Sequence, residues 1–437
     1  MNGYPRANGE RHHGRRPAAS ALLLGVLLLA GGCRDGNGAS ASSIGPGAGG
    51  PVNFIVPSTA GTNGCNGADQ LFMDCEEIDL GLALANASPG VSTLTRIAAA
   101  QSGSKLFYAT ATLSATGDST VIELDLTDPA NPLITHLIPV DKLDSLVSDF
   151  FAGPGVQAKL AGIAVLDADT VLVAELVSNT ILAVKRSVPP LLLHYAGAPS
   201  MAPTFIDGAA RSTAGFALDA ESELCPTEGG IVFVADTGNN AIRIIVASSA
   251  LDPNALVVTA TGKGPAGAGF RDGDLLTAIF DAPTGLSAHC ADRLIVTERG
   301  DSGAGHRLRS LIFTGFDPAM GMLDGMVWTE VGDGMPASSA GPSLMAQTAE
   351  PQAPAISSSG EVYWIDSLTG VLRRESVAGF VDCPLAPGGD CMTLSSMCPS
   401  AGPDFAPGAS FSTAISGAGD LYVLQTGTTR LRRFGPP

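Results

Sequence analysis

The chain has 437 residues, of which 45% are hydrophobic, 5% aromatic and 15% charged, and it contains 54 glycines and 30 prolines. This composition excludes low-complexity disorder and collagen, and no apolar run reaches the ~18 residues that a membrane-spanning helix needs. A net charge of −18 repels phosphate backbones and argues against nucleic-acid binding.

Residues 1–32 have the layout of a secretory signal peptide. A basic stretch with four arginines precedes the mostly apolar run 18–30, and Gly31 and Gly32 follow it. Removal of this segment takes away four arginines and one glutamate, so the net charge of the mature chain becomes −21. We therefore expect an exported protein with no nucleic-acid partner.

Cys33, directly after the two glycines, resembles the lipobox cysteine of bacterial lipoproteins, with one extra glycine in the motif. The resemblance implies cleavage before Cys33 and acylation of this cysteine, which would anchor the chain in a membrane. Arg34 at the next position favours the outer membrane of a bacterial cell envelope. The alternative is an ordinary signal peptide in which Cys33 has no such role. Residues 33–50 are rich in Gly, Ala and Ser and are typical of a flexible tether.

One pattern of short apolar segments recurs six times along the rest of the chain. The clearest copy has Gly215–Asp219, a strand at Gly230–Asp236, a turn at Thr237–Asn240 and a strand at Ala241–Val246. The central residues of the second strands lie 59 to 68 residues apart. They are Tyr108, Leu172, Phe233, Ile295, Tyr363 and Tyr422.

A small sheet of this kind is marginal alone, whereas sheets arranged radially bury both faces and protect their edges. We therefore predict an all-β chain: a single six-bladed β-propeller of four-stranded antiparallel blades over residues 51–437. The early apolar strand Val52–Val56 is expected to complete the last blade beside Leu431–Phe434. This pairing would close the ring across the two termini.

The best copy, with Gly215-Phe-Ala-Leu-Asp219 and then Val232-Phe-Val-Ala-Asp-Thr-Gly-Asn-Asn-Ala-Ile-Arg243, resembles the NHL repeat family of six-bladed propellers. Phe205-Ile-Asp-Gly208 and Phe270-Arg-Asp-Gly273 resemble the turn between bacterial NHL blades. The resemblance covers about residues 150–437 and is poor in the first repeat.

Seven cysteines remain besides Cys33, and most of them should pair in an oxidising compartment. They are Cys65, Cys75, Cys225, Cys290, Cys383, Cys391 and Cys398. The first two close a short local loop, the next two stand at related points of neighbouring repeats, and the last three form a cluster. The sequence has no Cys-x-x-Cys motif and no histidines at ligand spacing, so structural disulfides are favoured over a metal site.

A divalent ion on the axis of a propeller needs acids or histidines from several inner strands. Five inner strands are predicted: Gly162–Val165, Gly215–Asp219, Gly285–Ala288, Ala353–Ile356 and Thr413–Ile415. They offer Asp219 as their only acid, and His289 lies just beyond the end of one of them. Asp219 and His289 are therefore the candidate axial or rim ligands. We expect no cofactor, with Ca²⁺ as the alternative.

Two further groups of polar residues are explained by a structural role. Asp236–Asn240 is predicted to be a hairpin turn rather than a cation site. Arg373-Arg374 and Arg432-Arg433 are expected on outer strands, in contact with solvent or protecting a sheet edge.

Together these features favour an exported, lipid-anchored propeller that is a non-catalytic binding or scaffold module at the cell envelope, with a protein, peptide or glycan as its ligand. The alternative is a propeller enzyme, similar to lactonases or lyases, that holds a divalent ion on its axis.

Overall fold

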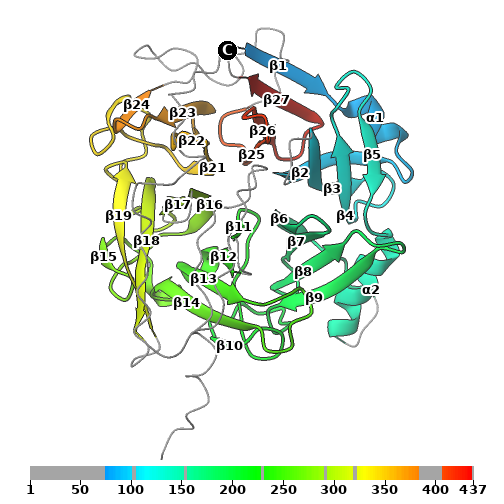
Figure 1. Cartoon of the computed structure of the whole chain (residues 1–437), viewed down its shortest axis with the longest axis horizontal. Coiled ribbons are helices and arrows are strands. Elements are labelled where there is room, and N and C mark those ends of the chain that lie inside the picture. The colour runs from blue at the N-terminus through cyan, green and yellow to red at the C-terminus, as the bar shows by residue number, and fades with distance from the viewer. Residues whose placement is uncertain are drawn as a thin grey trace, which may run out of the picture.

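The computed structural model describes residues 74–100, 105–151, 155–227, 231–289, 293–317, 322–382 and 406–435. The predicted signal peptide, the tether and the strand Val52–Val56 lie outside these residues. The described residues form six antiparallel sheets arranged as blades around a central axis (Figure 1). The predicted all-β, six-bladed propeller is thus confirmed.

Blades 1 and 2 have four strands each. Blade 1 contains β2 (Val91–Ala99), β3 (Leu106–Leu113), β4 (Ser119–Asp125) and β5 (Leu133–His136). Blade 2 contains β6 (Leu160–Asp167), β7 (Thr170–Glu175), β8 (Thr180–Lys185) and β9 (Leu191–Ala196). In both blades the strands run in chain order from the axis outwards.

Blades 3, 4 and 5 have four such strands and a short fifth strand at the outer edge. Blade 3 contains β11 (Leu224–Pro226), β12 (Ile231–Asp236), β13 (Ala241–Val246), β14 (Leu256–Gly262) and β10 (Gly208–Ala209). Blade 4 contains β16 (Pro283–His289), β17 (Arg293–Glu298), β18 (Arg307–Asp317), β19 (Met322–Val331) and β15 (Gly273–Asp274). Blade 5 contains β21 (Pro351–Ile356), β22 (Val362–Asp366), β23 (Val371–Glu375), β24 (Phe380–Asp382) and β20 (Gly341–Pro342).

The fifth strands correct the prediction of four strands in every blade. Each begins at a glycine with positive φ, namely 145° at Gly208, 140° at Gly273 and 144° at Gly341. Glycine adopts this conformation at little cost, so the chain turns onto the blade edge at these points. The predicted Asp207-Gly208 and Asp272-Gly273 turns thus lead into an added strand.

Blade 6 joins the two ends of the described chain and closes the ring (Figure 1). It contains β25 (Phe411–Ile415), β26 (Leu421–Gln425), β27 (Arg430–Gly435) and, at its outer edge, β1 (Asp74–Asp79). The predicted closure is therefore present, but β1 provides it instead of Val52–Val56. β1 fits because its acidic residues face the arginines of β27: Glu77 is paired with Arg432 and Asp79 with Arg430.

Two helices lie outside the blades. α1 (Gly81–Asn86) connects β1 to β2, and α2 (Val140–Phe150) connects blade 1 to blade 2. Leu143 and Val147 of α2 are buried on one face, as expected for residues four apart in a helix. No helix of the described part of the chain is long and apolar enough to cross a membrane.

The second and third strands of each blade are sandwiched between neighbouring blades, which buries them. This overturns the expectation of solvated arginines for three of the four paired residues, whereas the side chain of Arg433 stays 29% exposed. Arg373 is 1% exposed, Arg374 4% and Arg432 0%. These three arginines lie on β23 and β27, the third strands of their blades. Because they are buried, each forms ion pairs with carboxylates. Arg374, for example, contacts Glu361 at 3.1 Å and Asp382 at 2.7 Å.

The inner strand of blade 3 also differs from the prediction. Four predicted inner strands lie within β6, β16, β21 and β25, but Gly215–Asp219 does not form a strand beside β12. That position belongs to β11, in which Leu224 is paired with Val234. The segment before it crosses from the blade edge to the axis and is held by side chains: Asp236 accepts a hydrogen bond from the Ala217 N–H at 2.7 Å.

Candidate functional site

A cavity lies on the axis of the propeller, lined by the inner strands of all six blades. The lining residues that matter here are Arg96 and Ala99 of β2, Glu223 before β11, Ser287 of β16 and Ser412 of β25. The volume open to the centres of water molecules is about 90 Å³, enough for several waters, since one water needs roughly 10–15 Å³ by this measure. This axial cavity is the candidate functional site.

Most of the lining residues are of apolar or small type, but polar atoms make up the larger part of the wall surface, and among the described residues two charged side chains line it. The apolar residues are Ile97, Ala98, Ala99, Ile163, Ala164, Val165, Leu224, Pro226, Leu286, Pro354, Ala355, Ala414 and Ile415. The two charged residues are Arg96 and Glu223. Sequence reasoning missed Arg96 because the first repeat matches the pattern poorly, and it missed Glu223 because the inner strand of blade 3 was placed too early.

Arg96 is a buried guanidinium beside the cavity, with an exposed fraction of 2%. Its Nη1 donates to the carbonyl of Phe411 at 2.7 Å and to the Thr426 hydroxyl at 3.0 Å, and its Nη2 donates to the carbonyl of Ala220 at 2.6 Å. It forms no ion pair with a carboxylate of the described residues. Its positive charge is therefore compensated by neutral dipoles and by more distant charges.

Glu223 is one such charge and is half-buried directly before β11. Its Oε2 accepts a hydrogen bond from the Leu286 N–H at 3.0 Å. Burial raises the pKa of Glu223 to about 7, although the positive charge of Arg96 acts in the opposite direction. The cavity therefore contains a carboxyl group that titrates near neutral pH.

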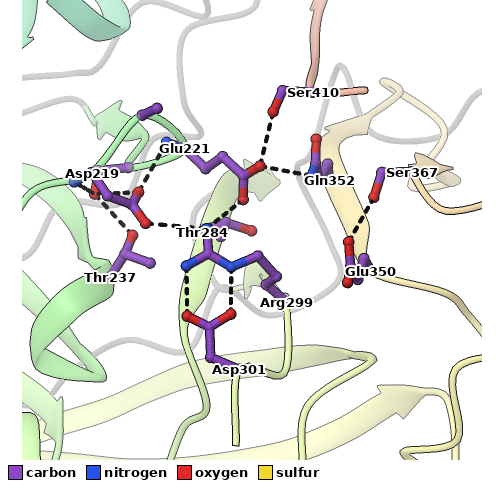
Figure 2. Close-up of polar contacts among 12 residues, drawn as sticks. Asp219, Glu221, Thr237, Thr284, Arg299, Asp301, Glu350, Gln352, Ser367 and Ser410 are labelled. Carbon is purple, nitrogen blue, oxygen red and sulfur yellow. Dashed lines mark hydrogen bonds and ion pairs between the residues drawn. The ribbon is translucent and has the colours of Figure 1, made fainter. Parts of the chain in front are cut away.

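A short loop, residues 219–223, lies at one end of the axis; we call it the plug. Figure 2 shows its acidic side chains around Arg299, which follows β17. Arg299 Nη1 contacts Asp219 at 3.1 Å and Glu221 at 2.8 Å, while Nε and Nη2 form a bidentate pair with Asp301 at 2.6 and 2.7 Å. Asp301 raises the pKa of Arg299, and Arg299 lowers the pKa of Asp301, so both stay charged.

Glu221 also connects the plug to blades 5 and 6 (Figure 2). Its Oε1 accepts hydrogen bonds from Gln352 Nε2 and from the Ser410 hydroxyl, each at 2.9 Å. Gln352 is itself fixed, because its Oε1 accepts the Phe411 N–H at 3.0 Å. Glu221 of blade 3 is therefore bonded to blades 4, 5 and 6 through a polar network that no single repeat of the sequence reveals.

The structure does not bring the two predicted ligands together. Asp219 lies in the plug, near Arg299 and so near the start of β16, because Pro283 is paired with Glu298. His289 is the last residue of β16, at the other end of the same strand. Among the described residues no group of three His, Cys, Asp or Glu side chains is placed to hold a metal ion.

The predicted Asp236–Asn240 turn is present. Thr237–Asn239 form one 3₁₀ turn, and Asn240 is left-handed, with φ 49°. Asp236 accepts hydrogen bonds from Asn239 and Arg243, each at 2.8 Å. Its oxygens are thus committed to the fold, as the turn interpretation requires.

Two of the predicted cysteines, Cys75 and Cys225, lie in the described part of the chain, and each is disulfide-bonded. Cys33, Cys65, Cys290, Cys383, Cys391 and Cys398 lie outside it, so the pairing stays a prediction.

Comparison of the sequence with protein-family models gives no match, and comparison with curated proteins gives none either. Solved structures of similar shape include a virginiamycin B lyase from Staphylococcus aureus (12% identity, 82% of this chain and 98% of that chain, TM-score 0.45). Others are an auxiliary nutrient binding protein from Bacteroides thetaiotaomicron (11%, 79% and 69%, 0.47) and the calcium-binding protein regucalcin from Agrobacterium tumefaciens (10%, 79% and 90%, 0.42). The likeness is one of overall shape.

Proposed function

We propose that this protein is an exported, lipid-anchored propeller of the NHL type that acts as a non-catalytic binding module at the bacterial cell envelope. The axial cavity is the observation that carries the proposal. All six blades contribute to its wall, so it is a product of the closed ring and not of one repeat. Its size suits one side chain of a peptide or one sugar unit of a glycan.

The wall of the cavity is organised before any ligand binds. Ser412 Oγ accepts the Ile97 N–H at 3.1 Å, and Thr413 Oγ1 donates to the Ala353 carbonyl at 2.9 Å, so both hydroxyls connect neighbouring blades. A pocket whose polar groups are already fixed loses little entropy on binding. Apolar walls with a few fixed polar groups are typical of small-ligand sites.

The proposal for the anchor is supported by the sequence around Cys33, where a basic stretch, an apolar run and two glycines precede the cysteine. Expression of the full chain in a Gram-negative host should place it in the outer-membrane fraction, with a mass increase on the peptide that begins at Cys33. The Cys33→Ser variant should lose both. Recovery of Cys33→Ser in the membrane fraction at the level of the parent chain would contradict the anchor.

The binding proposal is tested on the mature chain with monosaccharides and single amino acids as probes. We expect some of them to raise the melting temperature of the parent chain and to lose this effect in Glu223→Gln, because Glu223 lines the cavity. Turnover of a lactone or ester with a stoichiometric divalent ion would instead favour the enzyme alternative.

A further inference from the structure

We propose that the plug closes the axial cavity at the face of the ring where the inner strands begin, so that molecules reach the cavity from the opposite face, where these strands end. Closure of the plugged end depends on the contacts of the plug and not on any ligand. It holds whether or not the proposed ligand exists.

The plug contains residues that the corresponding connection of blade 4 lacks. Phe216 of blade 3 and Phe280 of blade 4 occupy equivalent positions. The ring centroid of Phe216 lies 5.4 Å from Cζ of Arg243, and that of Phe280 lies 5.0 Å from Cζ of Arg309. Leu218 and Ala282 are equivalent too, because Asn179 accepts the Leu218 N–H and Asn240 accepts the Ala282 N–H.

Leu224 and Leu286 are equivalent by register, being paired with Val234 and Val296 in the second strands. Three residues lie between Ala282 and Leu286, but five lie between Leu218 and Leu224. Blade 3 thus carries two extra residues at the axis.

These extra residues reach across the axis instead of looping outwards. Ala220 accepts a hydrogen bond from Arg96 of blade 1, and Glu221 contacts Arg299 of blade 4, Gln352 of blade 5 and Ser410 of blade 6. One loop of blade 3 is thus fixed to four other blades. A loop that spans the hub and is bonded on all these sides blocks that end of the axis.

The partly buried charges of the network hold the plug in place. The Glu221 side chain is 12% exposed and that of Arg299 23%. Lifting the plug would leave Arg299 without two of its three carboxylates and would separate Arg96 from the Ala220 carbonyl. Because these side chains are only partly exposed, the loss of several such contacts at once is unfavourable, and we expect the plug to stay in place.

The opposite end of the cavity has no comparable network among the described residues. The lining residues there are Ala99 and Pro226, the last residues of β2 and β11, together with Ala98 and Val165. Their side chains are small or apolar and make no side-chain hydrogen bonds across the axis. The proposed access route therefore lies at this end, and a labelling experiment tests it.

The test uses Ser287→Cys as a reporter inside the cavity and methyl methanethiosulfonate as the probe. The mass of the intact protein gives the labelling rate, measured against the parent chain. Ala99→Trp should slow labelling at least tenfold, because the indole narrows the open end. Val188→Trp, at a fully exposed position, should leave the rate unchanged.

Deletion of Asp219 and Ala220 gives blade 3 the spacing of blade 4. In the Ala99→Trp background this deletion should restore labelling at least tenfold, because the plugged end is then open. Glu221→Ala is the milder second variant, and circular dichroism with melting curves verifies that each variant is folded. Fast labelling in Ala99→Trp with an intact plug, or no recovery in a folded plug variant, would overturn the inference. If Ala99→Trp does not fold, Ala98→Trp takes its place.

Discussion

At the residue scale, three blades are built around buried arginines, and the sequence alone suggests that one of them, Arg373, is solvated. Arg243 contacts Asp236 at 2.8 Å, Arg309 contacts Glu298 at 3.1 Å, and Arg373 lies 3.6 Å from Asp366. In each case the acid ends the second strand and the arginine lies in the third. Because a third strand is covered on both faces, its guanidinium needs a buried carboxylate.

Asp236 and Asp207 both contact Arg243, but they differ in burial, which makes them a matched pair. The Asp236 side chain is fully buried, whereas that of Asp207 is 50% exposed. Asp236→Ala should lower the free energy of unfolding by about 3–5 kcal/mol, since it leaves a buried guanidinium uncompensated. Asp207→Ala should cost less than about 1 kcal/mol because solvent screens this pair. Urea unfolding of both variants checks the prediction; equal losses would contradict it.

Side-chain hydrogen bonds of three residues connect neighbouring blades. Asn179, Asn240 and His306 have positive φ values of 53°, 49° and 58°, and each accepts a backbone N–H of the next blade through its side chain. The donors are Leu218, Ala282 and Glu350, at 3.0, 2.8 and 3.2 Å. Asparagine tolerates this conformation well. Blade 4 uses a histidine for the same purpose, and only the unprotonated Nδ1 can accept.

This histidine predicts a pH dependence. Burial lowers the pKa of His306, as does Arg307, while Glu350, Asp281 and Asp366 act against this. The unfolded chain, with a histidine pKa near 6.5, then binds more protons than the folded chain, so stability falls as pH drops below about 6.5. His306→Asn should keep the hydrogen bond and flatten the curve of unfolding free energy between pH 5 and 7. An unchanged slope would show that His306 is not its source.

At the element scale, ring closure depends on charge complementarity between β1 and β27. Glu77 contacts Arg430 at 3.3 Å and Arg432 at 3.7 Å, and its side chain is 12% exposed. Glu76 contacts Arg433 at 3.2 Å but is 48% exposed. An outer strand rich in charges also protects the sheet edge from pairing with other chains.

Charge reversal separates the contributions of these two glutamates. Glu77→Lys should destabilise the chain by about 3 kcal/mol or more, since it adds a half-buried positive charge beside two arginines. Glu76→Lys should cost less than about 1 kcal/mol. Melting curves at low and high salt measure both, with the larger drop and the larger salt effect expected for Glu77→Lys. Equal drops would mean that closure rests on backbone pairing alone.

At the scale of the whole molecule, two of the strands that build the ring carry disulfide-bonded cysteines. Cys75 lies on the closing strand β1 and Cys225 on the inner strand β11, and both are disulfide-bonded. We predict the pairs Cys65–Cys75 and Cys225–Cys290. Peptide mapping of the exported, non-reduced protein should recover both linked peptides. Linkage of Cys225 to the cluster at 383–398 would contradict the second pair.

The sequence by itself determined the fold class, the number of blades and four of the six inner strands within β6, β16, β21 and β25, because period-two apolar strands and turn residues are local signals. It also predicted closure by an N-terminal strand, yet the choice of β1 required knowledge of which acidic strand meets Arg430–Gly435. Local patterns do not encode such pairing between residues about 350 positions apart.

The candidate site was decided by the tertiary structure. Arg96 belongs to blade 1, whereas Glu221 and Glu223 belong to the plug of blade 3, and they meet only because six strands converge on one axis. A two-residue insertion in blade 3 is invisible in composition and periodicity, but at the hub it determines which residues face one another. The physical reason is that burial and charge compensation depend on neighbours in space, whereas repeats and turns depend on neighbours in sequence.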